Sequence, residues 1–157
     1  MPDTRSSMEI LKPVLEGGPL AAPVAVGKAE IEALAAAAYA YFQQGMWDQA
    51  RNVFSALVTL APKLYVGHAG LGAVALAQKD LREAFRHLDA AAQMRPADPA
   101  VFSNAGEVVL RMGHPDKAEK VLRAAVALDP KGKDPSANRA RAMLLGIESA
   151  RTAAAQA

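Results

Sequence analysis

The side chains that most often carry chemistry are few in this chain and poorly spaced for it. The chain has three histidines, His68, His87 and His114, and no cysteine. The histidines form no HExxH pattern and no pair one helical turn apart, which is the spacing that two metal ligands on one helix need. Gly70 and Gly72 fall inside a helical pattern, where we expect them to permit helix contact rather than to bind phosphate. The sequence therefore predicts a protein that is not an enzyme and that has no metal site and no cofactor.

A second kind of chemistry, binding to nucleic acid, would have to use a basic segment near the C-terminus. The chain as a whole carries 18 basic and 16 acidic residues, a formal net charge of +2. Domains that bind nucleic acid usually carry a larger positive excess. We therefore interpret the segment as the solvated side of a helix and expect no nucleic acid partner. Its basic residues are Lys131, Lys133, Arg139 and Arg141.

The elements that must position any binding surface recur at one constant interval. This interval is 34 residues, the spacing of Pro62, Pro96 and Pro130 (96 − 62 = 34 and 130 − 96 = 34). A helix-turn-helix unit of this length resembles the tetratricopeptide repeat. We expect an all-α fold, a right-handed solenoid of three such repeats with a C-terminal capping helix and a short N-terminal helix. The same interval relates Ala38, Gly72 and Gly106, then Ala50, Ala84 and Ala118, and then Phe54, Leu88 and Leu122.

The residue types at these positions have a physical reason. We expect the small residues at the Ala38 position of the first helix to face those at the Ala50 position of the second, since only small side chains let two helices come close. Large residues at the Phe54 position would then fill the space between neighbouring repeats. In the second repeat Lys79 replaces the glycine expected in the turn, and Asp80 with Glu83 has the spacing of a capping box.

Three regions are predicted from the repeat and from composition. The N-terminal extension has a short helix, predicted from a capping box at residues 6–9 and an apolar side from Ile10 to Leu15, and then a Pro/Gly-rich linker. The helix is a candidate homodimer contact. No signal peptide or membrane-spanning run is found, so we expect a cytoplasmic protein without membrane insertion. The regions are residues 1–28, the repeats at 29–134 (about 31–64, 65–98 and 99–132), and a capping helix and tail at 135–157.

The first helices of stacked repeats should line a concave groove. This groove is predicted to be apolar in its middle, which suits an extended peptide that buries aliphatic or proline side chains. The alternative is that Phe42, Leu76 and Leu110 only complete the packing within each repeat. Leu76→Glu is expected to abolish partner binding while helical content is kept. The predicted lining is Tyr39, Phe42, Val66, Ala69, Ala73, Leu76, Ser103, Glu107 and Leu110.

Residues 41–50, with the sequence YFQQGMWDQA, continue into Val53, Phe54 and Leu57. This stretch resembles the first repeat of the class II chaperones of bacterial type III secretion. The resemblance implies a groove that holds the N-terminal segment of a secreted hydrophobic translocator, commonly a Pro-x-Leu-x-x-Pro-like stretch. The alternative function is a general repeat scaffold in another assembly, such as a pilus, motility or regulatory complex.

Overall fold

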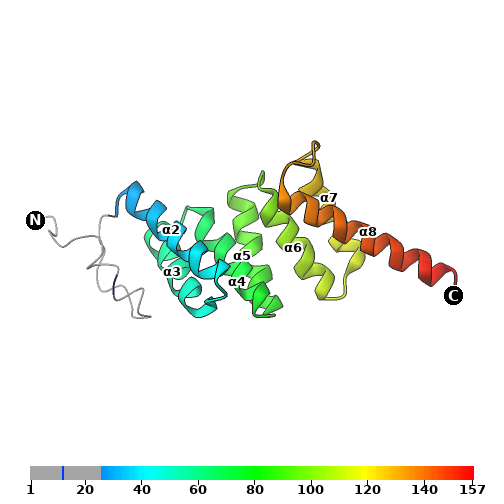
Figure 1. The fold of residues 1–157 in the computed structure, drawn as a ribbon, viewed down its shortest axis with the longest axis horizontal. Helices are drawn as coiled ribbons and strands as arrows, with labels where there is room; N and C mark the ends of the chain where they lie inside the picture. Colours follow the sequence, from blue (N-terminus) through cyan, green and yellow to red (C-terminus); the bar gives the residue numbers. More distant parts are fainter. Residues whose placement is uncertain (1–11, 13–25) are drawn as a thin grey trace, which may run out of the picture.

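A computed structural model describes Lys12 and residues 26–157 of the chain. This part contains seven helices and no strand, and none of its helices is long and apolar enough to cross a membrane. The all-α repeat fold is confirmed, whereas the predicted N-terminal helix and its dimer contact lie outside the described residues. Figure 1 shows the helices following one another along the long axis of the molecule. They are α2 (Lys28–Gln43), α3 (Trp47–Leu60), α4 (Tyr65–Ala77), α5 (Leu81–Met94), α6 (Pro99–Arg111), α7 (Pro115–Ala127) and α8 (Pro135–Ala155).

The turns inside the three repeats share one backbone conformation. Gly45, Lys79 and Gly113, which occupy the same position of successive repeats, have φ values of +72°, +65° and +83°. In each turn the next residue donates its N–H to the carbonyl five residues back, at 2.9 to 3.1 Å. This pattern is the Schellman ending of a helix, which places a left-handed residue after it. Lys79 therefore adopts the conformation that glycine adopts in the other two repeats, and we expect a strain of about 1 kcal/mol.

Aspartates begin three of the helices. The Asp80 carboxylate accepts the N–H of Glu83 at 3.1 Å, so half of the predicted capping box is present. Asp98 caps α6 by accepting the N–H of Ala100 at 2.9 Å, and Asp134 caps α8 by accepting two N–H groups. Proline occupies the first turn of α6 and α8, where its missing N–H leaves no hydrogen bond unmade.

Glycines allow the two helices of a repeat to pack closely. A Cβ atom added to Gly72 would lie 2.6 Å from Cγ of Leu88, and one added to Gly106 would lie 2.6 Å from Cγ of Leu122. Both leucines are fully buried. The prediction that these glycines face the alanines of the second helix is therefore refined: each glycine makes room for the large leucine of its own repeat.

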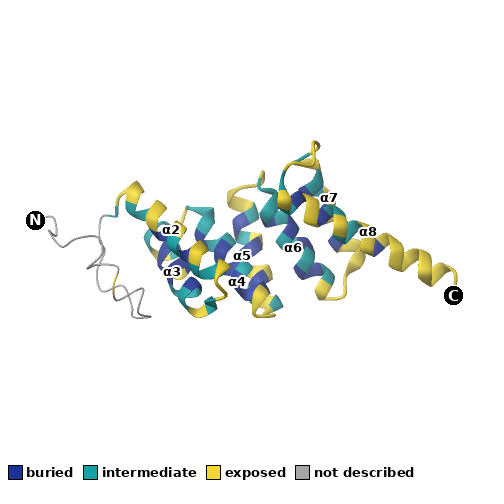
Figure 2. Cartoon of the chain, viewed as in Figure 1, coloured by how far each residue is buried: buried dark blue, intermediate teal, exposed yellow. Residues whose placement is uncertain are grey.

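Phe54 joins the first repeat to the second. A Cβ atom on Gly70 of α4 would collide with the fully buried Phe54 ring of α3, so this glycine permits contact between repeats as the sequence suggested. Three clusters of buried side chains follow one another along the chain, one for each repeat and the helix after it. Figure 2 shows these buried residues where the helices meet.

The last helix, α8, packs on α6 and α7. Arg151 binds Glu119 and Asp116 of α7, each at 2.6 Å, and Arg141 lies 3.4 Å from the carboxylate of Asp129. Ile147 is buried, but every residue from Glu148 to Ala157 is exposed (Figure 2). The first half of α8 therefore completes the stack, and its beginning reaches the inner face of α6.

Candidate functional site

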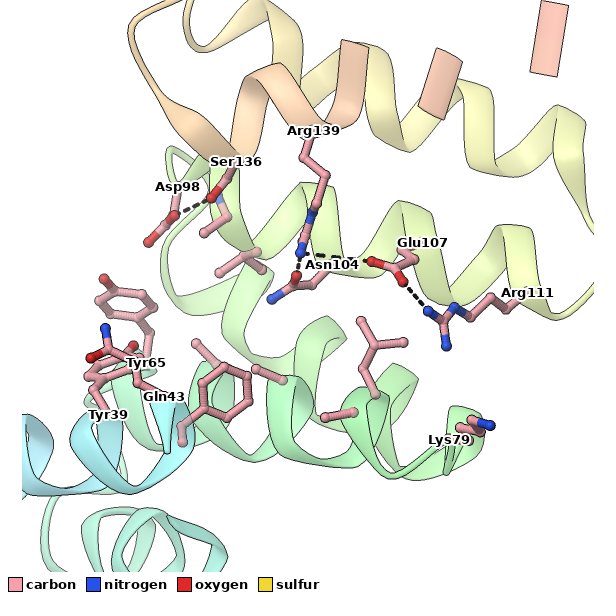
Figure 3. Close-up of a pocket in the computed structure, with 17 residues that line it drawn as sticks. Tyr39, Gln43, Tyr65, Lys79, Asp98, Asn104, Glu107, Arg111, Ser136 and Arg139 are labelled. Carbon is pink, nitrogen blue, oxygen red and sulfur yellow. Dashed lines mark hydrogen bonds and ion pairs between the residues drawn. The ribbon is translucent and has the colours of Figure 1, made fainter. Parts of the chain in front are cut away.

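A hollow of about 570 Å³ lies among the first helices of the three repeats and the beginning of α8. Its floor is formed by α4, with α2 at one end and α6 and α8 along the other side (Figure 3). It is lined by Tyr39, Phe42, Gln43, Tyr65, Ala69, Ala73, Leu76, Ala77, Lys79, Asp98, Ala100, Val101, Asn104, Glu107, Arg111, Ser136 and Arg139.

Two positions of the repeat contribute a lining residue from all three inner helices: one holds Gln43, Ala77 and Arg111, and the other is chemically the more varied. Tyr39, Ala73 and Glu107 are equivalent residues of successive repeats, and all three line the hollow. The position is aromatic in α2, small in α4 and acidic in α6. The shared backbone therefore presents three different chemical groups to one cavity.

Aromatic rings form the end of the hollow at α2. Tyr39 stacks edge-on against the buried Phe54, with ring centroids 5.2 Å apart, and it remains 42% exposed. Phe42 makes a similar edge contact with Trp47 at 5.2 Å. Each ring is thus held from behind while it still lines the cavity, which is how a preformed apolar contact surface is made.

Tyr65 adds a second phenol beside Tyr39 (Figure 3). Arg95 holds the Tyr65 ring by donating to its hydroxyl at 2.8 Å and by lying 4.7 Å above the ring centre. Burial raises the pKa of Tyr39 and of Tyr65 above the ordinary value, and nearby Asp98 raises both further. The two phenols therefore stay neutral and offer hydroxyl groups at the edge of an apolar surface.

Charged groups form the side of the hollow at α6 and α8. Glu107 lies between two arginines, 2.6 Å from Arg111 and 3.9 Å from Arg139. Arg139 also donates to Ser103 Oγ at 3.3 Å and to the amide oxygen of Asn104. The acidic group is thus already satisfied within the protein.

Six of the nine predicted groove residues lie together in this hollow. The other three do not line it: Val66 packs against the first core cluster, Leu110 packs against the third, and Ser103 is fully buried beneath Arg139. The repeat register does not hold at Ser103 because α8, rather than another repeat, covers α6. The six are Tyr39, Phe42, Ala69, Ala73, Leu76 and Glu107.

Leu76 belongs to both the hollow and the core. It lines the cavity but is only 7% exposed, and it clusters with Leu88 and Val108. Leu110 packs against the core and does not line the hollow, as the packing alternative expected, whereas Leu76 and the half-buried Phe42 both pack and line it. Leu76→Glu cannot separate binding from folding, because it would place a charge in the core.

Several polar lining residues were not predicted. Tyr65 is the first residue of α4 and Asp98 caps α6, and neither occupies a repeat position from which the lining was predicted. Arg139 was grouped with the basic C-terminal segment, but it is directed into the hollow (Figure 3). Only the packing of α8 on α6 reveals this, since no repeat register relates the two helices. The others are Lys79, Asn104 and Ser136.

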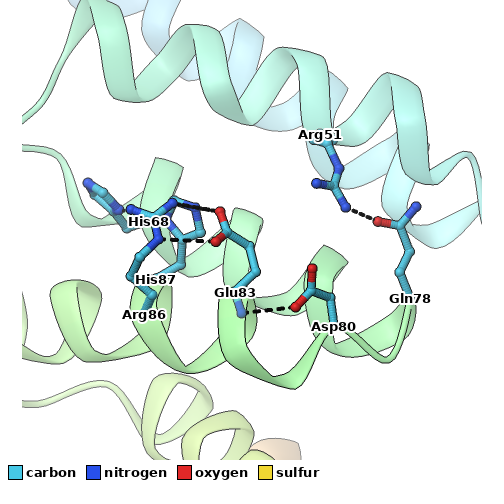
Figure 4. Close-up of polar contacts among 7 residues, drawn as sticks. All are labelled: Arg51, His68, Gln78, Asp80, Glu83, Arg86 and His87. Carbon is cyan, nitrogen blue, oxygen red and sulfur yellow. Dashed lines mark hydrogen bonds and ion pairs between the residues drawn. The ribbon is translucent and has the colours of Figure 1, made fainter.

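A separate polar cluster joins α4 and α5 (Figure 4). The Nδ1 atoms of His68 and His87 are 2.9 Å apart, and Nε2 of His87 is 3.0 Å from Glu83. Arg86 binds the same carboxylate at 2.6 Å. Sequence spacing missed this pair because the two histidines lie far apart in the chain, on facing helices. In the described part of the chain, no group of three or more acidic, histidine or cysteine side chains has the geometry of a metal site.

The histidine pair prefers two neutral rings. Burial lowers the pKa of His87 and of His68, and the charge of Arg86 lowers both further. Hydrogen bonding to Arg86 lowers the pKa of Glu83 to about 2. Neutral rings satisfy the contacts among the two histidines and Glu83 when His68 donates to Nδ1 of His87 and His87 donates to Glu83. Arg86 lies 2.9 Å from the same Nε2 atom of His87, but its hydrogen bonds go to the carboxylate of Glu83. A proton added to either ring keeps the hydrogen bond between the two Nδ1 atoms, but it places a further positive charge in a partly buried cluster beside Arg86.

Comparison with known proteins agrees with the repeat assignment. The tetratricopeptide repeat model matches residues 75–144. No curated protein matched the chain. Among solved structures, SycD, the type III secretion translocator chaperone of Yersinia enterocolitica, has a TM-score of 0.74 at 26% identity, covering 81% of this chain and 98% of SycD.

Two further structures extend the similarity. PcrH of Pseudomonas aeruginosa in complex with the chaperone binding region of PopB is 30% identical, with a TM-score of 0.69, covering 76% of this chain and 98% of PcrH. A type III secretion complex from Aeromonas hydrophila has a TM-score of 0.72 at 26% identity, covering 92% of this chain and 97% of its counterpart. On this similarity, the chain belongs to the family of tetratricopeptide-repeat translocator chaperones of type III secretion.

Proposed function

We propose that this protein is a chaperone that holds an extended N-terminal segment of a hydrophobic secreted translocator in the hollow between α2, α4 and α6. The observation that carries the proposal is the hollow itself, with apolar side chains on its floor and Tyr39 and Phe42 at one end. Complexes of related proteins support it. PcrH has been solved with the chaperone binding regions of PopD and PopB, and SycD with a peptide of the translocator YopD.

The mechanism is binding alone. An extended peptide can place alternate side chains against the aromatic end and the alanine floor while its backbone stays in the open hollow. The apolar area removed from water, at about 25 cal/mol per Å², sets an upper limit for the affinity, from which the cost of ordering the peptide is subtracted. Occupying the segment would keep the translocator from pairing early or aggregating.

The test is a capture experiment with matched variants. Ala73→Glu places a charge on the partly exposed floor of the hollow, and Ala150→Glu places the same charge on the exposed end of α8. Tagged wild-type protein and Ala150→Glu should capture the same secreted hydrophobic protein from the native host, and Ala73→Glu should lose it. Circular dichroism should show equal helical content in all three.

The captured protein distinguishes the chaperone from the general scaffold, which would use the same hollow. A synthetic peptide from its N-terminal region should bind the wild-type protein and compete with the full-length partner. Capture of pilus, motility or regulatory components in place of a secreted hydrophobic protein would favour the scaffold. Equal capture by Ala73→Glu and the wild type would refute use of the hollow.

A further inference from the structure

The described chain resumes at Val26, two residues before α2, and the segment before it has an unusual composition. Residues 13–25 read PVLEGGPLAAPVA, with three prolines, several aliphatic side chains and a single charge, Glu16. We propose that this segment binds in the hollow of its own chain, in cis, as an internal ligand that a partner must displace. The displacement step rests on the proposed function, whereas the intramolecular contact does not.

The chemistry of the segment fits the chemistry of the hollow. Proline-rich chains are recognised by aromatic side chains that contact the proline rings, at a low cost in chain entropy. Tyr39, Phe42 and Tyr65 provide such rings, and Ala69 and Ala73 leave room on the floor. The segment therefore has the properties of the extended aliphatic and proline-containing peptide that this surface suits.

The segment is also long enough to reach the hollow. Along α2, Phe42 lies about 21 Å beyond Lys28 at the helical rise. An extended chain from Gly27 back to Leu20 covers about 22 Å at the rise of a polyproline helix. Leu20, with Pro19 beside it, can thus lie against the aromatic end without any change in α2.

The surface of α2 offers an apolar path along this distance. Four alanines spaced by three or four residues are exposed on one side of the helix. Gln43 continues the row at the next such interval and lines the hollow. The path thus leads from the beginning of α2 to the cavity. The alanines are Ala29, Ala33, Ala36 and Ala40.

Charge supports the same placement. With Leu20 beside Phe42, an extended chain carries Glu16 about 12 Å farther along the hollow. Figure 3 shows Lys79 and Arg111 at the end of the hollow away from Tyr39. Within the described residues Lys79 has no acidic partner within 4.0 Å, so the one charge of the segment would lie toward an unpaired cation.

Paired cysteines in the full-length chain test the contact directly, since the natural chain has none. Leu20→Cys combined with Ala73→Cys should form an intramolecular disulfide. The rate should be at least about ten times that of Leu20→Cys combined with Phe85→Cys, because binding raises the effective concentration at the hollow. Phe85 is exposed on α5 and lies outside the lining. Equal rates, or disulfide-linked dimers at low protein concentration, would overturn the proposal.

A labelled peptide of residues 13–25 gives a second test. Leu20→Asp in the full-length chain should release the internal segment and tighten binding of the added peptide. If the segment fills the hollow nine-tenths of the time, the gain is about ten-fold. Thr4→Asp, which adds the same charge outside the segment, should leave the affinity at the wild-type value. Failure of the peptide to bind Leu20→Asp would contradict the proposal.

The two proposals fail in different ways. If Leu20→Cys combined with Ala73→Cys forms its disulfide slowly, and Ala73→Glu loses the secreted partner, the internal ligand is refuted and the chaperone function is supported. If the disulfide forms fast, and Ala73→Glu captures the partner as well as the wild type does, the internal ligand is supported and the chaperone function is refuted.

Discussion

The two ends of the hollow are built from opposite kinds of side chain. At α2 the lining is aromatic, with Tyr39 and Phe42 supported from behind by Phe54 and Trp47. At α6 and α8 it is ionic, and Glu107 already has two arginine partners. The first end has contact area to offer, whereas the second would exchange one set of ion pairs for another.

This difference indicates how a bound chain would be recognised. Burying apolar area provides most of the affinity, and half-exposed ion pairs add little because water and salt screen them. Complementary charges nevertheless fix direction and register. We therefore expect affinity to depend on the aromatic end and orientation on the ionic end.

The largest effect is expected at Leu76, which lies between the two ends. Because this side chain is nearly buried, Leu76→Glu should lower the free energy of unfolding by more than about 3 kcal/mol. Ala77→Glu, next to it but exposed, should change stability by less than about 0.5 kcal/mol. Urea unfolding followed by circular dichroism measures both. Wild-type stability in Leu76→Glu would place this side chain in the groove alone.

The next effect compares the two ends directly. Phe42→Ala should weaken binding of a partner peptide about ten-fold or more, since a preformed aromatic contact is lost. Arg139→Ala should weaken it only about two- to five-fold, and less at high salt. Isothermal titration at two salt concentrations measures both. A larger loss in Arg139→Ala would reverse the assignment of the two ends.

A smaller effect should separate the hollow from the histidine cluster. Because the pKa of His87 is lowered by folding, the unfolded chain binds more protons below about pH 6.5, and stability falls as the pH drops through that range. The melting temperature should therefore decrease from pH 7.5 to 5.5. His87→Gln should show a weaker decrease. The two tyrosines of the hollow should add no change in melting temperature over this pH range, because their raised pKa values keep them neutral throughout. An unchanged slope in the variant would exclude the histidine pair.

The smallest effect concerns the turn at the ionic end. Lys79→Gly should stabilise the fold by about 1 kcal/mol, because glycine adopts the left-handed conformation without strain. Gly113→Lys is the reciprocal change at the equivalent turn, where a Cβ atom would meet nothing within 4 Å, and should destabilise by a similar amount. Thermal unfolding compares the pair. Destabilisation by Lys79→Gly, or stabilisation by Gly113→Lys, would disprove the strain at Lys79.

Most of the fold could be predicted because the same sequence pattern occurs in three successive repeats. The prolines, small residues and large apolar residues recur in one register, and each turn follows the same pattern. The register could not predict which glycine of a first helix contacts which large side chain of a second helix. Gly72 meets Leu88, and Gly70 meets Phe54 of the preceding repeat, since these contacts depend on how the helices are rotated.

The site was predictable only where the repeat continues. Tyr39, Ala73 and Glu107 follow from the register, but Arg139 does not, since it belongs to a helix outside the repeats. The same helix explains why Ser103 is buried. The histidine pair lies beyond any local pattern, because two facing helices bring together residues that no sequence spacing relates.

The lining position that holds Tyr39, Ala73 and Glu107 is distinct from the positions that bury Phe54, Leu88 and Leu122. Substitutions at the first set would change the chemistry of the cavity wall while the large buried side chains between the helices stay the same. A designer could therefore exchange one residue per repeat, in any combination, to retarget the cavity on an unchanged stack of helices.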